Sequence, residues 1–112
     1  MQAPEIMRNT VLRTYNTADD FGTQDLLHAT IGLVGEVGEL SDSIKRNLFY
    51  GQEFDRENII EELGDIFYYL TALLICYGTD LDEVTYENGK KLAQRYPQGF
   101  TKEASIQRAD KN

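Results

Sequence analysis

Two pairs of acidic residues in this chain have the spacing that a shared cation requires. Glu36 precedes Glu39 by three positions, and Glu62 precedes Asp65 by the same interval. On an α-helix, this spacing places both side chains of a pair on one face, within reach of a common ion. A chain with 19 acidic residues also contains such pairs by chance. The position of each pair relative to the apolar residues must therefore decide whether the pair can belong to a metal site.

Apolar periodicity predicts the two helices that carry these pairs. At about 100° of rotation per residue, Glu36 lies roughly 90° from the centre of the apolar stripe of its helix. Glu62 and Asp65 take nearly the same offset from the following stripe, whereas Glu61 points toward solvent. Both pairs also lie at similar depths from the connector between the helices, to within about one turn. Folding the helices into an antiparallel hairpin therefore brings the carboxylates together at the edge of the core.

Carboxylates gathered in this way favour a bound cation. They repel one another, and their pKa values rise unless a divalent ion is present. Oxygen ligands suit Mg²⁺ or Mn²⁺, whereas zinc prefers nitrogen and sulfur. Gly32 and Gly35 lie on the same side as Glu36, and we expect their missing side chains to leave room for a ligand. The alternative is that the acidic residues are ordinary charges at the rim of a helical bundle.

Helical periodicity extends through most of the chain and predicts an all-α bundle of about four helices. The expected helices cover residues 4–15, 24–48, 56–77 and 80–96, and the second and third form the central antiparallel hairpin. Thr79 and Asp82 resemble a capping box at the start of the fourth helix. We expect one domain over residues 1–100, followed by a polar tail over residues 101–112.

The two central helices carry more apolar surface than a hairpin can cover. Their surplus residues are Leu27, Ile31, Val34, Tyr68, Thr71 and Ile75. A short chain also buries a smaller share of its surface than a longer one. Because such surface usually needs a partner, we expect a homodimer or a homotetramer.

Composition excludes several classes of partner. The net charge of −8 repels nucleic-acid polymers and anionic membranes, although a free nucleotide remains possible because Mg²⁺ offsets its charge. The most apolar run, residues 66–77, is shorter than the roughly 20 residues needed to cross a bilayer. The single Cys76 cannot form an internal disulfide, and no charged-then-apolar leader opens the chain. We therefore expect a cytoplasmic protein.

The fourth predicted helix carries polar residues where an apolar face should lie. Asn88, Lys91 and Arg95 share or border its stripe, and the two cations could hold phosphate oxygens. Their alternative role is a favourable charge near a helix C-terminus. The single histidine, His28, lies away from the apolar stripe of its helix and is interpreted as a surface residue. Cys76 is interpreted as core packing.

Three segments together resemble a known family. They are residues 32–40 (GLVGEVGEL), residues 61–66 (EELGDI) and residues 88–97, which include Asn88, Lys91 and Arg95. The chain is similar to MazG-like nucleotide pyrophosphohydrolases over roughly residues 20–100. This resemblance implies an all-α fold that cuts nucleoside triphosphates between the α and β phosphates. The products would be a monophosphate and pyrophosphate, with Mg²⁺ as the cofactor.

The resemblance also implies a role for each site residue. The metal ligands would be Glu36, Glu39, Glu62 and Asp65. The phosphate contacts would be Asn88, Lys91 and Arg95. Glu39 is in addition the candidate to orient or deprotonate the attacking water. Gly35 stands where the family often has a further glutamate, so any contact made by that side chain is missing here.

Two other functions fit the same pattern. One is a non-catalytic helical module that binds a nucleotide or a partner, and the other is a phosphoribosyl-nucleotide pyrophosphohydrolase of related fold. The sequence does not identify the base of a nucleotide substrate. The aromatic residues that could stack on a base are equally credible as packing residues: Tyr15, Phe21, Tyr50 and Tyr69.

Overall fold

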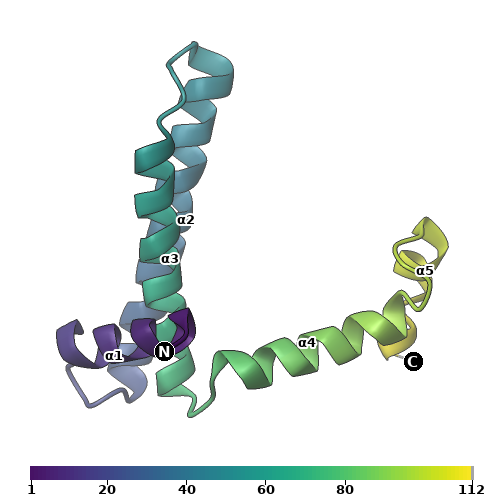
Figure 1. The fold of residues 1–112 in the computed structure, drawn as a ribbon, viewed down its shortest axis with the longest axis horizontal. Coiled ribbons are helices and arrows are strands. Elements are labelled where there is room, and N and C mark those ends of the chain that lie inside the picture. The colour runs from purple at the N-terminus through teal and green to yellow at the C-terminus, as the bar shows by residue number, and fades with distance from the viewer. Residues whose placement is uncertain (112) are drawn as a thin grey trace. The chain divides into compact units, whose positions relative to one another are not determined.

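A computed structural model describes residues 1–111 of the chain (Figure 1). These residues form α-helices and one short 3₁₀ turn, and the described part of the chain holds no β-strand. The all-α fold predicted from the sequence is thus confirmed. Contacts divide the chain into two compact units, residues 1–78 and the residues from Thr79 onward. Each unit is described by itself below.

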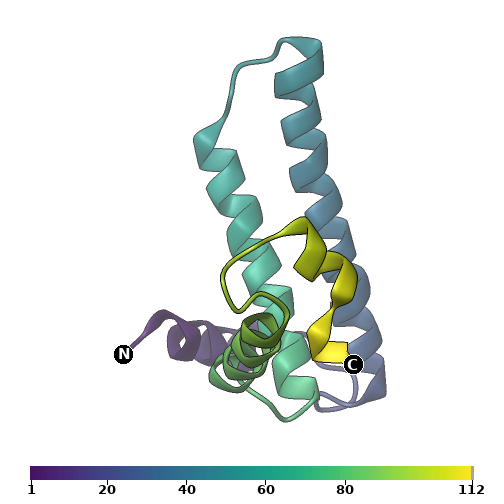
Figure 2. The same ribbon diagram turned by 90° about the vertical axis from the view of Figure 1, so that its right-hand side faces the viewer.

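The first unit is built on two long helices that lie side by side (Figures 1 and 2). These are α2 (Thr23–Tyr50) and α3 (Arg56–Cys76). Helix α2 ends at Gly51, whose φ of +69° is the left-handed conformation that favours glycine. Helix α3 begins after Asp55, whose carboxylate accepts a hydrogen bond from the Asn58 amide at 3.1 Å. Only five residues therefore separate the helices, which keeps Glu36 and Glu62 at matching depth.

The surface along which α2 and α3 meet is made of small and polar residues. Ala29 and Ala72 are fully buried, and the Asn58 side chain donates a hydrogen bond to the Ser43 hydroxyl at 3.0 Å across the helices. Alternating steps of three and four residues generate such a contact line between two helices. The positions that follow this rule here are 29, 32, 36 and 43 on α2, and 58, 62, 65, 69 and 72 on α3. Glu36 and Glu62 thus lie within the contact between the helices, whereas Asp65 lies at its exposed edge.

This arrangement differs in part from the apolar hairpin face that periodicity predicts. Val37 and Leu48 recur at helical spacing in the apolar stripe of α2, yet they are 48% and 68% exposed. On α3, Leu63 is 49% exposed, whereas the neighbouring Glu62 is only 9% exposed. The apolar stripes are thus only a partial guide to the α2/α3 contact, because Leu33 and Leu40 on α2 and Ile66 and Leu70 on α3 are partly buried while other members of the stripes are exposed. Much of the apolar surface faces outward instead.

A small core closes one end of the helix pair. Helix α1 (Ala3–Thr14) packs against α3. Its Thr14 hydroxyl and that of Tyr68 are 2.9 Å apart. The fully or largely buried apolar residues are Val11, Tyr15, Ala29 and Ala72. Because this core is confined to the α1 end, the remaining length of α2 and α3 depends on the contact between those two helices.

The loop between α1 and α2 is organised around a buried carboxylate. Asp25 is fully buried and accepts hydrogen bonds from the amides of Ala18 and Phe21, both at 2.7 Å, and from the Thr17 hydroxyl. Burial alone would raise its pKa, but these hydrogen bonds outweigh that effect and lower the pKa of Asp25 to about 2. The sequence indicated only that a polar segment ends the first helix. In the structure, hydrogen bonds from Thr17, Ala18 and Phe21 to the Asp25 carboxylate hold this loop against the start of α2.

The second unit begins with α4 (Leu81–Arg95). Asp80 caps this helix by accepting a hydrogen bond from the Glu83 amide at 2.8 Å, so the predicted capping box of Thr79 and Asp82 is wrong by one position. Helix α5 (Lys102–Gln107) and a 3₁₀ turn, η1 (Ala109–Lys111), occupy the predicted polar tail. Residues 1–111 thus contain five α-helices, one more than the approximate number predicted.

None of the helices among residues 1–111 combines the length and the apolar character that a membrane crossing requires.

Candidate metal and nucleotide site

Three of the four predicted metal ligands meet between α2 and α3. Glu36, Glu62 and Asp65 each offer one carboxylate oxygen, and these three oxygens all lie within 4.8 Å of one another. Glu36 comes from the middle of α2, while the other two are one turn apart on α3. Glu62 is almost buried, Glu36 is partly buried and Asp65 is exposed. The group therefore runs from the helix contact outward to solvent.

Two oxygens of this cluster are left without a hydrogen-bond donor. The Oε2 atoms of Glu36 and Glu62 are buried and have no partner among the described residues. Burial, the contact with Glu62 and the charges of Glu39 and Asp65 raise the pKa of Glu36 to about 7. Burial also raises the pKa of Glu62, and the charges of Glu39 and Asp65 add to that rise. The carboxylates of this cluster therefore repel one another between α2 and α3.

Glu39 lies at the edge of the cluster. It is exposed and stands outside the group of three oxygens, yet its charge contributes to the raised pKa values of Glu36 and Glu62. Glu61 is exposed, as the helical phase predicted. Helical phase therefore separated the buried member of the adjacent pair, Glu62, from its solvated neighbour.

The two glycines beside the cluster differ in what surrounds them. An added Cβ at Gly32 would lie 2.5 Å from the Tyr69 ring, so the expectation that this glycine leaves room for a ligand is wrong. Tyr69 already fills the space. At Gly35 a Cβ would meet no atom within 4 Å, so the surface beside that residue is open. Glycine at position 32 serves the packing of an aromatic ring one turn beyond Asp65.

An ordered histidine accompanies this ring. The Nδ1 atom of His28 is 3.1 Å from the Tyr15 hydroxyl, and the His28 ring meets the Tyr69 ring edge-on with centroids 6.1 Å apart. Interpretation of the sequence placed His28 on the surface without a role. Although the residue is exposed, its ring is held in place by these contacts. The spacing of His28, Gly32 and Glu36 in steps of four could have indicated that they share a helix face.

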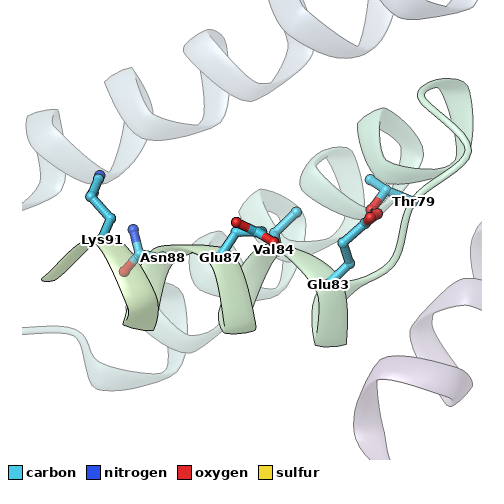
Figure 3. A pocket seen from close by; sticks show the side chains of 6 residues that line it. All are labelled: Thr79, Glu83, Val84, Glu87, Asn88 and Lys91. Atoms are coloured by element: carbon cyan, nitrogen blue, oxygen red, sulfur yellow. The ribbon is translucent and has the colours of Figure 1, made fainter. Parts of the chain in front are cut away.

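The predicted phosphate-binding residues all lie on α4, in the second unit. Asn88 and Lys91 line an open hollow of about 500 Å³, shown in Figure 3, together with Thr79, Glu83, Val84 and Glu87. Arg95 has a different environment. Its guanidinium forms a bidentate ion pair with the Asp110 carboxylate, with N–O distances of 2.7 and 3.0 Å. The ion pair joins the end of α4 to η1 within that unit.

The carboxylate cluster fits a hard divalent cation. Mg²⁺ and Mn²⁺ bind oxygen ligands, and Mg²⁺ is commonly held by only one or two carboxylates plus water and substrate phosphates. Glu36 and Glu62 supply buried oxygens that lack a donor, and Asp65 supplies a ligand open to solvent. A cation placed among them would offset the repulsion that raises the pKa of Glu36. The donor set is therefore one that a divalent metal ion could use.

Comparisons with known proteins identify the family of the chain. The family profile of the MazG nucleotide pyrophosphohydrolase domain matches residues 24–100, which include both acidic pairs and all of α4. The chain is also 35% identical over 81 residues to the Gene 37 protein of Mycobacterium phage L5, an alignment that covers 68% of this chain and 70% of that protein. No solved structure matches the chain. On the strength of the profile match and this relative, the chain belongs to the MazG nucleotide pyrophosphohydrolase family.

Proposed function

We propose that the protein is a Mg²⁺-dependent nucleoside triphosphate pyrophosphohydrolase that cleaves its substrate between the α and β phosphates. The observation that carries this proposal is the cluster of Glu36, Glu62 and Asp65, with two buried carboxylate oxygens that lack a hydrogen-bond donor. Family membership supports the reaction class. Mn²⁺ would serve as an alternative ion, because it shares the preference for oxygen ligands.

Within this proposal, all four carboxylates are metal ligands and Glu39 has a second role. Glu36, Glu62 and Asp65 hold the ion, which would polarise the phosphate oxygens and lower the pKa of the attacking water. Glu39 is exposed at the edge of the cluster, so it can reach a water molecule on the solvent side while still contributing negative charge to the site. We assign it the role of orienting and deprotonating that water, in addition to ligating the ion.

The residues on α4 are proposed to bind the phosphate chain. Lys91 and Asn88 line the same hollow, and a lysine ammonium beside an amide suits negatively charged phosphate oxygens. Arg95 is also proposed as a phosphate contact, on the strength of the family resemblance. It would have to exchange the Asp110 carboxylate for phosphate oxygens, since both groups bind a guanidinium through paired hydrogen bonds.

We further propose that the protein works as a homodimer or a homotetramer. The surface of α2 and α3 that faces away from their mutual contact exposes many large apolar side chains. They include Leu27, Ile31, Val34, Val37, Ile44, Leu48, Ile60 and Leu63. A monomer would leave this surface in water, at a cost that grows with the exposed apolar area. A second copy of the chain would cover it.

The proposed reaction is tested by the identity of its first product. Purified protein is incubated with each common nucleoside triphosphate and deoxynucleoside triphosphate in the presence of Mg²⁺. We expect pyrophosphate and the nucleoside monophosphate from at least one of them, and no reaction in EDTA. Orthophosphate as the sole initial product would contradict the α–β assignment. Stoichiometric binding without turnover would support the non-catalytic alternative instead.

A further inference from the structure

His28 is an exposed residue with an unusually fixed side chain. Its Nδ1 atom is 3.1 Å from the hydroxyl of Tyr15, and that hydroxyl donates a hydrogen bond to the backbone oxygen of Asp25 at 3.2 Å. Tyr15 is 9% exposed and its ring packs against Phe21. The partner that orients His28 is thus itself held by the buried core of the first unit.

This network also determines which nitrogen of His28 is available. The hydroxyl of Tyr15 has a single proton, which it donates to the Asp25 carbonyl. It must then accept the hydrogen bond from Nδ1–H of His28. In the neutral ring this arrangement leaves Nε2 with a free lone pair, able to accept a hydrogen bond from a ligand. The fixed tautomer therefore presents a hydrogen-bond acceptor of defined position at the surface of the first unit.

His28 lies on the same side of α2 as the carboxylate site. At about 100° per residue, His28, Gly32, Gly35, Glu36 and Glu39 fall within an arc of roughly 100°. The eight residues from His28 to Glu36 correspond to about 12 Å along the helix axis. The nucleoside of a substrate whose phosphates are bound at the carboxylates can span that distance. The surface beside Gly35, between the two, is open.

We infer that His28 is a specificity-determining residue that binds the base of the nucleotide substrate through the Nε2 acceptor at the edge of its ring. The ring of Tyr69 supports the His28 ring from one side, at a centroid distance of 6.1 Å. A base that presents an N–H donor toward Nε2 is favoured over one that presents an acceptor there. Tyr15 is a positioning residue for His28. This inference rests on the proposed function, because it requires a nucleoside triphosphate at the carboxylate site.

The experiment compares substrates with and without a base. KM and kcat are measured for the common nucleoside triphosphates on wild type, His28→Ala, His28→Phe and Thr30→Ala. Inorganic tripolyphosphate is used as a competitive inhibitor that carries no base. Thr30 is the matched control, since it is exposed on the same helix about 160° away from His28. Alanine suits a helix interior, so substitution at exposed position 28 should preserve the fold.

We expect His28→Ala to raise KM for the preferred nucleotide about tenfold, since the loss of one hydrogen bond costs up to about this much. The inhibition constant of tripolyphosphate should change less than about twofold. His28→Phe keeps an aromatic ring but lacks the acceptor, so it should bind the nucleotide no better than His28→Ala and should discriminate less among the bases. Tyr15→Phe should also raise KM, and it should add little to the effect of His28→Phe. Thr30→Ala should match wild type.

Two results would overturn the inference while leaving the proposed reaction intact. One is an unchanged KM for every nucleotide in His28→Ala. The other is a weakened binding of tripolyphosphate in proportion to the rise in KM, which would show a general effect on the phosphate site. If wild type hydrolyses none of the nucleotides, the proposed function itself fails, and the inference fails with it.

Discussion

The ring of Tyr69 occupies the space that a side chain at Gly32 would need. A Cβ at position 32 would lie 2.5 Å from the ring, far closer than atoms in contact approach. Tyr69 stands one turn after Asp65 on α3, and Gly32 stands one turn before Glu36 on α2. The close approach therefore sets the distance between the two helices directly beside the carboxylate cluster.

Replacing each neighbouring glycine by alanine tests this relationship. Gly35→Ala should raise the free energy of unfolding by about 0.5–1 kcal/mol, because alanine favours the helix and its methyl group meets no atom. Gly32→Ala gains the same helix propensity, but the methyl group must displace the Tyr69 ring. We expect a net loss of stability for Gly32→Ala in chemical denaturation without metal. Equal stabilisation by both substitutions would show that Tyr69 moves freely.

The carboxylate cluster predicts an unusual response to the loss of charge. Removing one carboxylate relieves repulsion, so the Gln or Asn variants should melt in EDTA at or slightly above the temperature of wild type. The same variants should lose at least about 100-fold in hydrolysis and show a smaller rise in melting temperature with Mg²⁺. The variants are Glu36→Gln, Glu39→Gln, Glu62→Gln and Asp65→Asn.

Glu61→Gln is the control for this series. It adjoins Glu62 in sequence but is exposed, so it should keep both the activity and the Mg²⁺ response of wild type. If all five variants respond to Mg²⁺ like wild type, the cluster does not bind the ion.

Asp25 predicts a loss of stability in acid. Its pKa is lowered to about 2, so the folded state favours the ionised form. As pH falls from about 4 toward 2, the unfolded chain takes up a proton before the folded chain does, and the free energy of unfolding decreases. In Asp25→Asn this part of the pH dependence should be absent, and the melting temperature at neutral pH should fall by about 5 °C or more.

The matched control is Asp20→Asn, which changes an exposed residue of the same loop. Its stability curve between pH 2 and 4 should follow that of wild type. The measurement is denaturant unfolding followed by circular dichroism at several pH values. A wild-type curve that stays flat over this interval would contradict the assignment of Asp25.

Adjacent lysines on α4 allow a direct test of the phosphate contact. Lys91 lines the hollow with Asn88, whereas Lys90 is exposed and pairs with Glu87 at 3.1 Å. Lys91→Ala should raise KM for the nucleotide about tenfold or more, while the stabilisation by Mg²⁺ alone stays unchanged, since a lost charge-assisted hydrogen bond has that magnitude. Lys90→Ala should leave steady-state kinetics unaffected. If Lys91→Ala and Lys90→Ala have the same KM and kcat, Lys91 does not contact the phosphates.

The sequence predicted the helices and three members of the acidic cluster because both depend on local periodicity. Spacing and helical phase were enough to place Glu36, Glu62 and Asp65 together and to set Glu61 aside. The packing face was predicted only in part, because apolar residues were assumed to mark the contact between the helices. Val37, Leu48 and Leu63 are exposed instead.

Other features depend on contacts between residues that are distant in sequence. The hydrogen bond between His28 and Tyr15 joins two helices, and the ion pair between Arg95 and Asp110 spans 15 residues. No helical period relates such positions to each other. Asp25 was missed for a related reason: its partners are backbone amides of the preceding loop, and their direction is set by the path of the chain rather than by residue type.

Because Glu36 and Glu62 belong to different helices, an ion bound between them would also tie α2 to α3. The small core lies at the α1 end of these helices, so their central turns have few other buried contacts. Amide hydrogens around residues 36 and 62 should then exchange with solvent through local opening in the absence of metal, and more slowly once it binds. Amides beside Ala29 and Ala72 should exchange at rates that hardly depend on the ion. A bound ion would in this way set the rigidity of the central turns of α2 and α3.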